Sequence, residues 1–238
     1  MHFSLQISTF GHGAAPCGWT IEKRTEMQRL YYIKGGSGAY LRGDGQWEAF
    51  RSGCFYLFPY NFRAVFTNST EQPVDHVYFD FVSMPPLLAA EPLCIPAGST
   101  VLSALAQLLT QSVPSHNCAD FETGEALLRM TLRLLEKQVC LPFSTDALIA
   151  EALRRIWDGY AGPLCIAELA AAVHLEENHF IRRFRRVMGQ TPYAYLRTYR
   201  LTLAKQALLC GDTLAQAAEK VGYQSAASLS RALRSAEI

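Results

Sequence analysis

The sequence predicts an α+β protein in which an antiparallel β-barrel is followed by amphipathic helices and by an all-helical C-terminal domain. Short β-branched and aromatic runs separated by glycine turns extend from residue 19 to residue 82. Leucines then recur at helical spacing up to residue 139, and the last third contains a weak internal repeat of helical pattern. We therefore expect three segments, residues 1–98, 99–145 and 146–238.

The composition excludes a chain dominated by a basic arm or an acidic tail. Half of the 238 residues are hydrophobic, and 22 Lys plus Arg stand against 21 Asp plus Glu. Residues 1–98 hold 7 cations and 8 anions, residues 99–146 hold 3 and 5, and residues 147–238 hold 12 and 8. The positive excess of the last segment is a modest indication of contact with phosphate groups.

The cysteines and the start of the chain indicate a cytoplasmic protein without a membrane span. Seven scattered cysteines lack C-x-x-C spacing, which predicts neither a disulfide framework nor a zinc site. The first residues show neither the basic opening nor the apolar core of a signal peptide. The uncharged stretch 92–119 is interrupted by prolines and carries a polar stripe, so it predicts an amphipathic soluble helix.

Glycine clusters divide the first segment into strands. The clusters at 35–38 and 43–45 are typical of hairpin turns, because glycine adopts positive φ without steric cost. Several strands at close spacing, with no helical pattern between them, predict an antiparallel barrel or sandwich.

The second segment predicts two helices, over residues 99–113 and 120–140. Four leucines form a stripe wider than one barrel face is expected to cover, namely Leu127, Leu128, Leu134 and Leu135. This stripe predicts a homodimer through the two helices. Asp146 then predicts the N-cap of a further helix.

The third segment contains two copies of a helix-turn-helix spacing, at residues 166–189 and 214–235. Each copy has an alanine where its helices cross, and the second begins with the capping-box pair Thr213 and Gln216. Between the copies, residues 192–210 predict a helix about 28 Å long. That length nearly matches the roughly 34 Å between successive major grooves of DNA.

The exposed faces of the two second helices are candidate DNA-contacting surfaces. In the first copy, four arginines within five positions repel one another unless an anion lies opposite, although a solvated arginine face is the simpler alternative. Side chains near the start of such a helix reach base edges, and those on its flank meet phosphates. The candidates are Asn178, His179, Arg182, Arg183, Arg185 and Arg186 in the first copy, and Gln224, Ser225, Ala227, Ser228, Arg231 and Arg234 in the second.

Three motifs of the last segment, Gly189-Gln190-Thr191-Pro192, Arg200-Leu201 and Val221-Gly222-Tyr223, occur together with the two helix-turn-helix copies. This combination closely resembles the DNA-binding domain of the AraC/XylS transcription regulators. Upstream, the runs YYIKGGSGAYLRGDGQWEAF and DHVYFDF resemble the cupin-type effector domain of the arabinose-responsive branch. Cys165, His174 and Glu176 depart from the serine, glycine and serine that are usual in the family.

The resemblance implies a ligand-responsive, sequence-specific transcription regulator. Residues 1–98 would form a cupin-like effector-binding domain, residues 99–145 a connecting and dimerisation segment, and residues 146–238 the DNA-binding domain. The partners implied are double-stranded DNA, a small effector such as a sugar, a second copy of the chain and, for an activator, RNA polymerase. No catalytic activity and no cofactor are implied. The alternative is a cupin-type small-molecule binding protein or enzyme whose helical tail is an interaction module.

The same resemblance implies effector-contacting residues: Trp19, Arg24, Arg63, His76 and Tyr78. His76 and Tyr78 alternate onto one face of a strand. The histidines do not form the His-x-His set of metal-binding cupins, and Arg63 stands where a late cupin histidine is expected, so we expect no metal site. An aromatic-lined barrel is suited to hold one small ligand.

Overall fold

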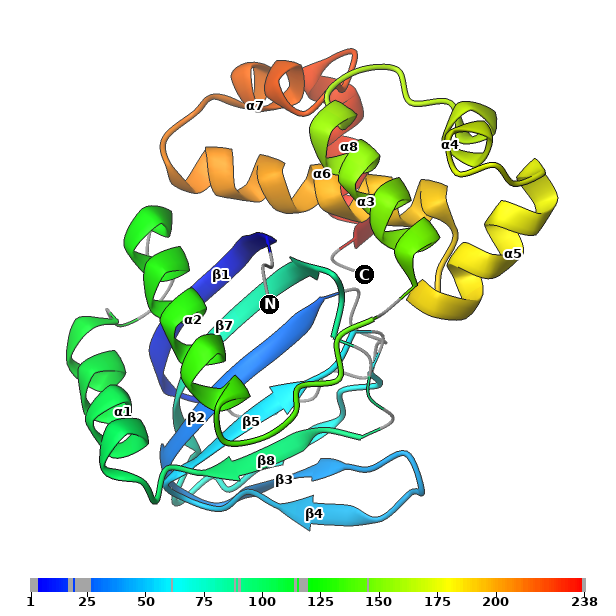
Figure 1. The fold of residues 1–238 in the computed structure, drawn as a ribbon. Coiled ribbons are helices and arrows are strands. Elements are labelled where there is room, and N and C mark those ends of the chain that lie inside the picture. Colours follow the sequence, from blue (N-terminus) through cyan, green and yellow to red (C-terminus); the bar gives the residue numbers. More distant parts are fainter. Residues whose placement is uncertain are drawn as a thin grey trace. The chain divides into compact units, whose positions relative to one another are not determined.

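The computed structural model describes residues 4–16, 19, 27–60, 62–87, 89, 91–113, 115, 120–144 and 146–236. The chain folds into two compact units, Met1–Phe143 and Ser144–Ile238. The first unit combines strands with two helices, and the second is helical, which confirms the α+β prediction (Figure 1). The segment that we expected to connect the domains lies, up to Phe143, within the first unit.

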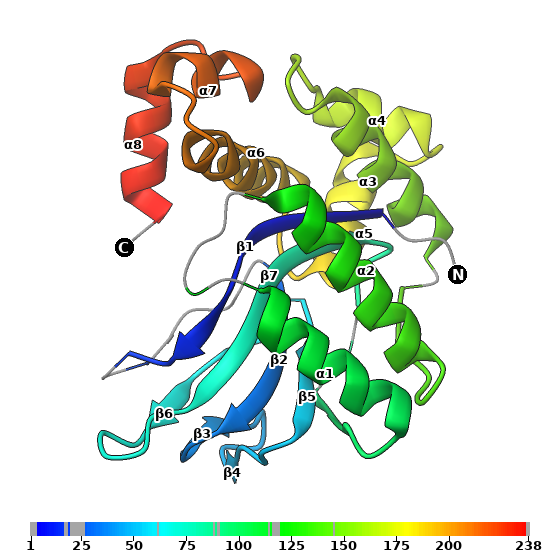
Figure 2. The same cartoon turned by 90° about the vertical axis from the view of Figure 1, so that its left-hand side faces the viewer.

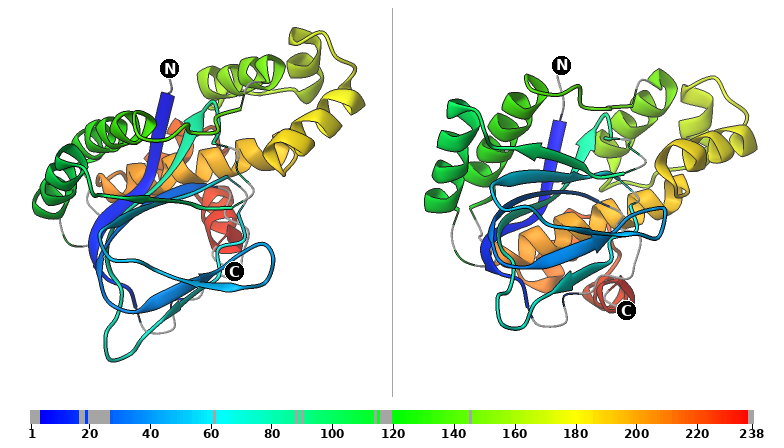
Figure 3. Two further views of the ribbon diagram at one scale, coloured as in Figure 1. Left: turned by 60° about the horizontal axis from the view of Figure 1, so that its bottom comes forward. Right: turned by 90° about the horizontal axis from the view of Figure 1, so that it is seen from below.

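The strands of the first unit form two antiparallel sheets. The larger sheet has the order β1-β7-β2-β5-β8 and the smaller has the order β4-β3-β6. The strands are β1 (Ser4–Ala14), β2 (Gln28–Gly35), β3 (Gly38–Leu41), β4 (Trp47–Ala49), β5 (Cys54–Phe58), β6 (Phe66–Asn68), β7 (Asp75–Met84) and β8 (Leu93–Pro96). Viewed from below, the curved strands surround a common interior, as a barrel does (Figure 3).

The larger sheet is buried on both faces. Phe55 and Leu57 of β5 pack into one core, and Tyr56 and Phe58, which alternate with them, pack into another. The first core lies under the helices, and the second lies between the two sheets together with Tyr40 and Phe66. This explains why β5 is apolar throughout, since every residue of a strand covered on both faces leaves water.

Two helices cover the outer face of the larger sheet: α1 (Thr100–Ser112) and α2 (Phe121–Glu136) (Figure 2). Leu127, Leu128 and Leu135 are buried in the same core as Phe79 of the sheet, and Leu134 is half-buried against it. The expectation that these leucines form a dimer interface is therefore wrong. They pack on the chain's own sheet, because the close approach of α2 at Gly124 lets that face bury the whole stripe.

The second unit contains six helices within residues 146–236. They are α3 (Ala147–Gly159), α4 (Ile166–Ala172), α5 (Glu177–Met188), α6 (Pro192–Leu209), α7 (Leu214–Lys220) and α8 (Ala226–Ala236). The predicted caps are confirmed, because Asp146 accepts from the Ile149 N–H and Thr213 makes a complete capping box with Gln216. Within the part of the chain that the structure describes, no helix is long and apolar enough to cross a membrane.

Helix α6 joins the two helix-turn-helix units. Its 18 residues give a rod of about 27 Å, close to the predicted length. Tyr195 of this helix packs against Phe184 of the first helix-turn-helix and accepts a hydrogen bond from the Trp157 indole at 2.9 Å. Farther along, Leu201 and Ala204 pack with Leu229 of the second. One helix thus contributes to the cores of both units.

Candidate ligand cavity and nucleic-acid interface

Helix α5 begins and ends at residues that fix its orientation. Glu176 caps its start, where one carboxylate oxygen accepts from the Asn178 N–H and the other from the His179 N–H, each at 3.0 Å. These bonds to the charged form lower the pKa of Glu176. Gly189 ends the helix in the left-handed conformation, with φ of 69°. Glu176 therefore caps α5 in place of the serine that is usual in the AraC/XylS family. It also places a carboxylate at the positive end of the helix dipole.

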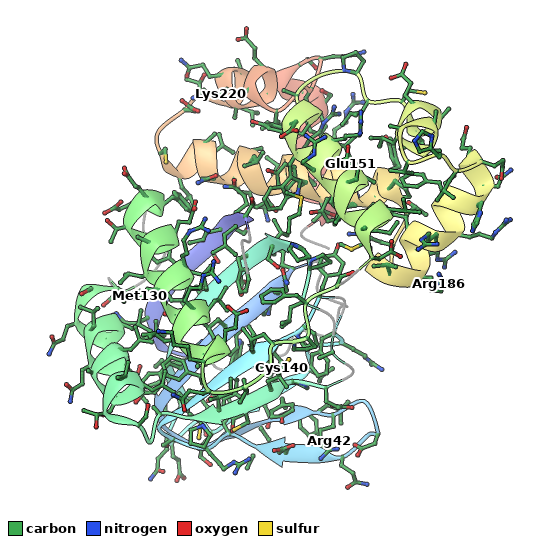
Figure 4. The ribbon with its side chains drawn as sticks, in the orientation of Figure 1. Arg42, Met130, Cys140, Glu151, Arg186 and Lys220 are labelled. Carbon is green, nitrogen blue, oxygen red and sulfur yellow. The ribbon has the colours of Figure 1, made fainter. Side chains whose placement is uncertain are left out.

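The outer face of α5 presents a line of cationic side chains. Phe180, Phe184 and Met188 are buried, whereas four residues of the opposite face line a hollow of about 350 Å³: His179, Arg182, Arg183 and Arg186. Figure 4 shows Arg186 projecting from the helix. Among the described residues, no carboxylate forms an ion pair with Arg182, Arg185 or Arg186. This face is therefore free to meet an anion.

The predicted residues of α5 do not all share that face. Arg183 is half-buried, and its Nε donates to the Asp146 carboxylate at 3.0 Å, so this arginine also ties α5 to the start of α3. The Asn178 amide donates to Glu176 at 3.1 Å, and Arg185 is exposed beside the hollow rather than in it. The sequence could not distinguish these roles, because all of these positions look exposed on a helical wheel.

Helix α8 presents fewer charges. Gln224, Ser225, Ala227, Arg231 and Arg234 are exposed, and Ser228 is half-buried. Ser225 and Ser228 cap the helix start reciprocally, since each hydroxyl accepts from the backbone N–H of the other residue at 3.2 Å. Among the proposed contacts of the second helix-turn-helix, Ser225 and Ser228 are thus already engaged in capping.

The turns of the two helix-turn-helix units reach the same conformation with different residues. His174 has φ of 56° and Gly222 has φ of 74°. A Cβ added at Gly222 would lie 2.3 Å from the Ala161 carbonyl oxygen, so no larger residue fits there. In the first helix-turn-helix, His174 occupies the left-handed position, which has a modest conformational cost for a residue other than glycine.

A second candidate site lies in the first unit, in a cavity of about 350 Å³. It is lined by His12, Gly13, Ala14, Pro16, Trp19, Arg29, Tyr31, His76, Tyr78 and Asp80. The register of β2 and β7 creates it, because Arg29 lies opposite Asp80 and Tyr31 lies opposite Tyr78. Alternate residues of both strands therefore point to the cavity, while Leu30, Val77 and Phe79 point to the helix-covered core.

The polar end of the cavity is a buried ion pair. The Arg29 Nε lies 3.3 Å from the Asp80 Oδ1, and the two side chains are 9% and 17% exposed. A further Arg29 nitrogen donates to the Tyr31 hydroxyl at 3.4 Å. Burial raises the pKa of Asp80, and the Arg29 charge offsets only part of that rise.

The remaining wall is aromatic. The Trp19 ring lies 5.0 Å from His76 and 4.6 Å from Phe66, measured between centroids, and His76 lies 4.9 Å from Tyr31. Burial lowers the pKa of His76 to about 4, so its imidazole is neutral at pH 7. Gly11 makes room for this wall, because a Cβ there would meet the Tyr78 hydroxyl at 2.8 Å.

The structure places three of the five proposed effector residues, Trp19, His76 and Tyr78, in the cavity wall. Arg63 is exposed and is not among the described lining residues, and Arg24 lies outside the described residues. Arg29 and Tyr31 also line the cavity, although they were not predicted from the sequence. Arg29 and Tyr31 are alternate residues of β2, so they share one face of that strand. The sequence could not show that this face lines the cavity, because the partner strand β7 was not known.

Among the described residues, no three His, Cys, Asp or Glu side chains gather as a metal site would require. The described lining of the cavity contains two histidines and one carboxylate, and that carboxylate is already paired with Arg29. The chemistry of the two sites is therefore a cationic helix face in the second unit and a small aromatic cavity with one ion pair in the first.

Comparison with known proteins supports this two-part description. Residues 169–237 match the helix-turn-helix domain family. Proteins described as AraC-like transcription regulators in Streptomyces antibioticus and Streptomyces lividans are each 34% identical over 90 residues, which is 37% of this chain. The matched region spans 30% of the length of these relatives.

Solved structures extend the likeness to the whole fold. A crystal structure of ToxT from Vibrio cholerae superimposes with a TM-score of 0.58 at 12% identity, covering 99% of this chain and 94% of that one. A second ToxT structure, with an unsaturated fatty acid bound, gives 0.56 at 12%, covering 98% and 91%.

Fold and sites thus define a two-domain protein that joins an antiparallel barrel with a small cavity to a tandem helix-turn-helix domain. Its C-terminal domain is an AraC-type helix-turn-helix domain, similar to that of the AraC-like transcription regulators above.

Proposed function

We propose that this chain is a transcription regulator that binds specific sequences of double-stranded DNA and responds to a small molecule held in its barrel. The observation that carries the proposal is the cationic face of α5, since Arg182, Arg185 and Arg186 form no ion pair with a carboxylate within the described residues. Such a face on the second helix of a helix-turn-helix suits a major groove.

The second helix-turn-helix would contribute less sequence discrimination. Its exposed cations, Arg231 and Arg234, can meet phosphates, while Gln224 and Ala227 offer little for reading bases. Because α6 is about 27 Å long, the two units can address successive major grooves. We infer that α5 supplies most of the specificity and α8 mainly adds affinity.

A sugar effector is not supported by the comparisons. The cavity itself offers aromatic walls and a single ion pair, and we take this chemistry as the guide to the effector. Cytoplasmic location, homodimerisation and activation through RNA polymerase belong to the same proposal by family resemblance. For a dimer, α1 offers the exposed Val101 and Leu108 in place of the buried leucines. Helix α2 offers the exposed Met130 (Figure 4).

The test is selection of duplexes from a random pool by the full chain, followed by titration of the selected duplex at several salt concentrations. Counterion release predicts a steep fall of affinity as salt rises. The paired substitutions Arg182→Glu and Arg186→Glu should abolish binding. The matched control, Arg42→Glu with Arg51→Glu, makes the same charge change at exposed positions of the first unit and should leave binding intact. Failure to enrich any sequence, or equal loss in both variants, would overturn the proposal.

Dimerisation is tested separately by sedimentation of the wild type and of a variant with Leu108→Glu and Met130→Glu. Both side chains are exposed, at 41% and 38%, so the variant is expected to fold. A dimeric wild type and a monomeric variant support the interface. A monomeric wild type at the concentration that binds DNA contradicts it.

A further inference from the structure

The ion pair in the barrel leaves hydrogen-bonding capacity unused. The Arg29 Nε and the Asp80 Oδ1 face each other at 3.3 Å but make no hydrogen bond, and neither atom has another partner. Both residues line the cavity. The only hydrogen bond of the pair to the described residues is the one from Arg29 to the Tyr31 hydroxyl. A guanidinium group and a carboxylate group therefore lie side by side among the described residues of the cavity wall.

The fixed charges of the described cavity lining balance. Arg29 and Asp80 cancel each other, and the described lining contains no further Lys, Arg, Asp or Glu. His76 lies at the centre of the aromatic wall, within 5.0 Å of Trp19 and 4.9 Å of Tyr31, and is neutral at pH 7. A ligand with a full charge would bring that charge into a buried site without a counter-charge, which is costly.

The walls favour a flat ligand. Trp19, Tyr31 and Tyr78 offer ring faces around a volume of about 350 Å³, at the small end of ligand sites. Rings of this kind gain from offset or edge-on contact with another ring. The polar end is confined to one place, the pair formed across β2 and β7.

We propose that the barrel cavity selects an uncharged, planar ligand whose amide-like group offers an acceptor to Arg29 and a donor to Asp80. The ring of the ligand packs among Trp19, Tyr31 and Tyr78, and its polar edge satisfies both members of the ion pair at once. The inference rests on the proposed effector-binding function and specifies the class of effector.

A carboxylate ligand is the main competitor. It could pair with Arg29 only by displacing Asp80, which would then have to take up a proton. An anion that binds in this way takes up protons on binding, whereas an uncharged amide does not. The two modes are therefore separable by measurement.

The experiment uses three probes of nearly the same shape and different charge: benzamide, benzoate and benzamidinium. Each is titrated calorimetrically into the full chain at pH 7.5, up to about 10 mM, a range suited to ligands of so few atoms. Benzamide should bind at least about tenfold more tightly than either ion, a difference of about 1.4 kcal/mol. Its binding heat should not depend on the buffer, because no proton is exchanged.

Substitutions in the pair should redirect the preference. Asp80→Asn leaves the Arg29 charge unbalanced, so the preference should move toward benzoate. Arg29→Gln leaves the Asp80 charge unbalanced, so the preference should move toward benzamidinium. Arg42→Ala changes an exposed arginine of the same unit that is not among the described lining residues, and it should change nothing. If Arg29→Gln does not fold, Arg29→Met with Asp80→Leu removes both charges together and should favour toluene over benzamide.

The proposal is overturned if benzoate or benzamidinium binds the wild type best, if Asp80→Asn leaves the ranking unchanged, or if no probe binds at all. None of these measurements involves DNA. Their failure would leave the DNA-binding proposal standing, and failure of the duplex selection would leave the cavity result standing.

Discussion

The two units of the molecule use charge in opposite ways. The first unit encloses Arg29 and Asp80 between strands, with side chains only 9% and 17% exposed. The second unit places several of its arginines on the surface, Arg154 and Arg186 among them. Arg154 is paired there with Glu151 at 2.8 Å, and Arg186 faces solvent without a partner.

The difference shows what each arrangement can recognise. A buried pair acts over a short distance on one enclosed ligand, because little water screens it. Exposed arginines are screened by salt at distances beyond about 8 Å, so they act on a polyanion that comes into contact with them. Changes that affect buried charge should therefore alter stability, and changes that affect exposed charge should alter DNA affinity.

The largest expected effect comes from breaking the buried pair. Arg29→Met leaves the Asp80 carboxylate unpaired, which should destabilise the first unit by about 3–5 kcal/mol. Hydrogen exchange at the amides of β2 and β7 measures the loss locally. The double variant Arg29→Met with Asp80→Leu is the control, and it should recover most of the stability. A single variant as stable as the double would show that the pair is not effectively buried.

The next largest effect is a loss of stability in the first unit at acid pH, where His76 takes up a proton. The folded pKa of His76, about 4, lies below its unfolded value of about 6.5, so the unfolded state binds the extra proton. Stability from the neutral imidazole is complete above the unfolded pKa and is lost as the pH falls from 6.5 toward 4, by roughly 3 kcal/mol at pH 4.

The measurement is the difference in unfolding free energy between the wild type and His76→Asn at pH 7 and pH 4.5. This difference isolates His76 from Asp80, whose pKa is raised by burial and which titrates in the opposite sense. If both proteins lose the same stability on acidification, His76 is not the group responsible.

The third effect concerns DNA. Arg182→Ala should weaken binding to the selected duplex by about 1–3 kcal/mol, with the loss concentrated at particular base pairs. Arg63→Ala removes the same charge from an exposed site of the first unit and should leave affinity unchanged. Equal loss on every sequence would make Arg182 a phosphate contact. The slope of log affinity against log salt concentration should then fall in magnitude by about one.

The smallest effect is expected for the surface network of α3. Glu151 accepts from Arg154 and from Arg155 at 2.7–2.9 Å, and these bonds lower its pKa to about 2. Solvent screens this network, so Glu151→Gln should leave the unfolding midpoint of the second unit unchanged at neutral pH. A clear loss of stability would mean that the exposed ion pairs of Glu151 stabilise the fold as the buried pair of Arg29 and Asp80 is expected to do.

Local chemistry made much of the helical unit predictable from sequence. Asp146 and Thr213 cap their helices as predicted, because each cap needs only a side-chain oxygen and an N–H three residues along the chain. The left-handed Gly222 and the length of α6 are likewise properties of short segments.

Non-local pairing decided the rest. The cavity exists because β2 and β7, which 39 residues separate in the sequence, pair with Arg29 opposite Asp80. A shift of one residue would turn both side chains to the other face. Trp19, His76 and Tyr78 could be proposed from resemblance alone. Arg29 could not be proposed, and the leucines of α2 could not be assigned to the chain's own sheet, because both depend on contacts between distant segments.

By itself the sequence determined the fold class and the two helix-turn-helix units with their caps, because these follow from hydrophobic period and short-range hydrogen bonding. Its motifs also carried the resemblance to AraC-type regulators. Only the tertiary structure decided which charges are buried as a pair, which arginine of α5 is held by Asp146, and which residues face the cavity. These features depend on strand register and helix packing between residues far apart in the chain, and a local pattern contains no record of either.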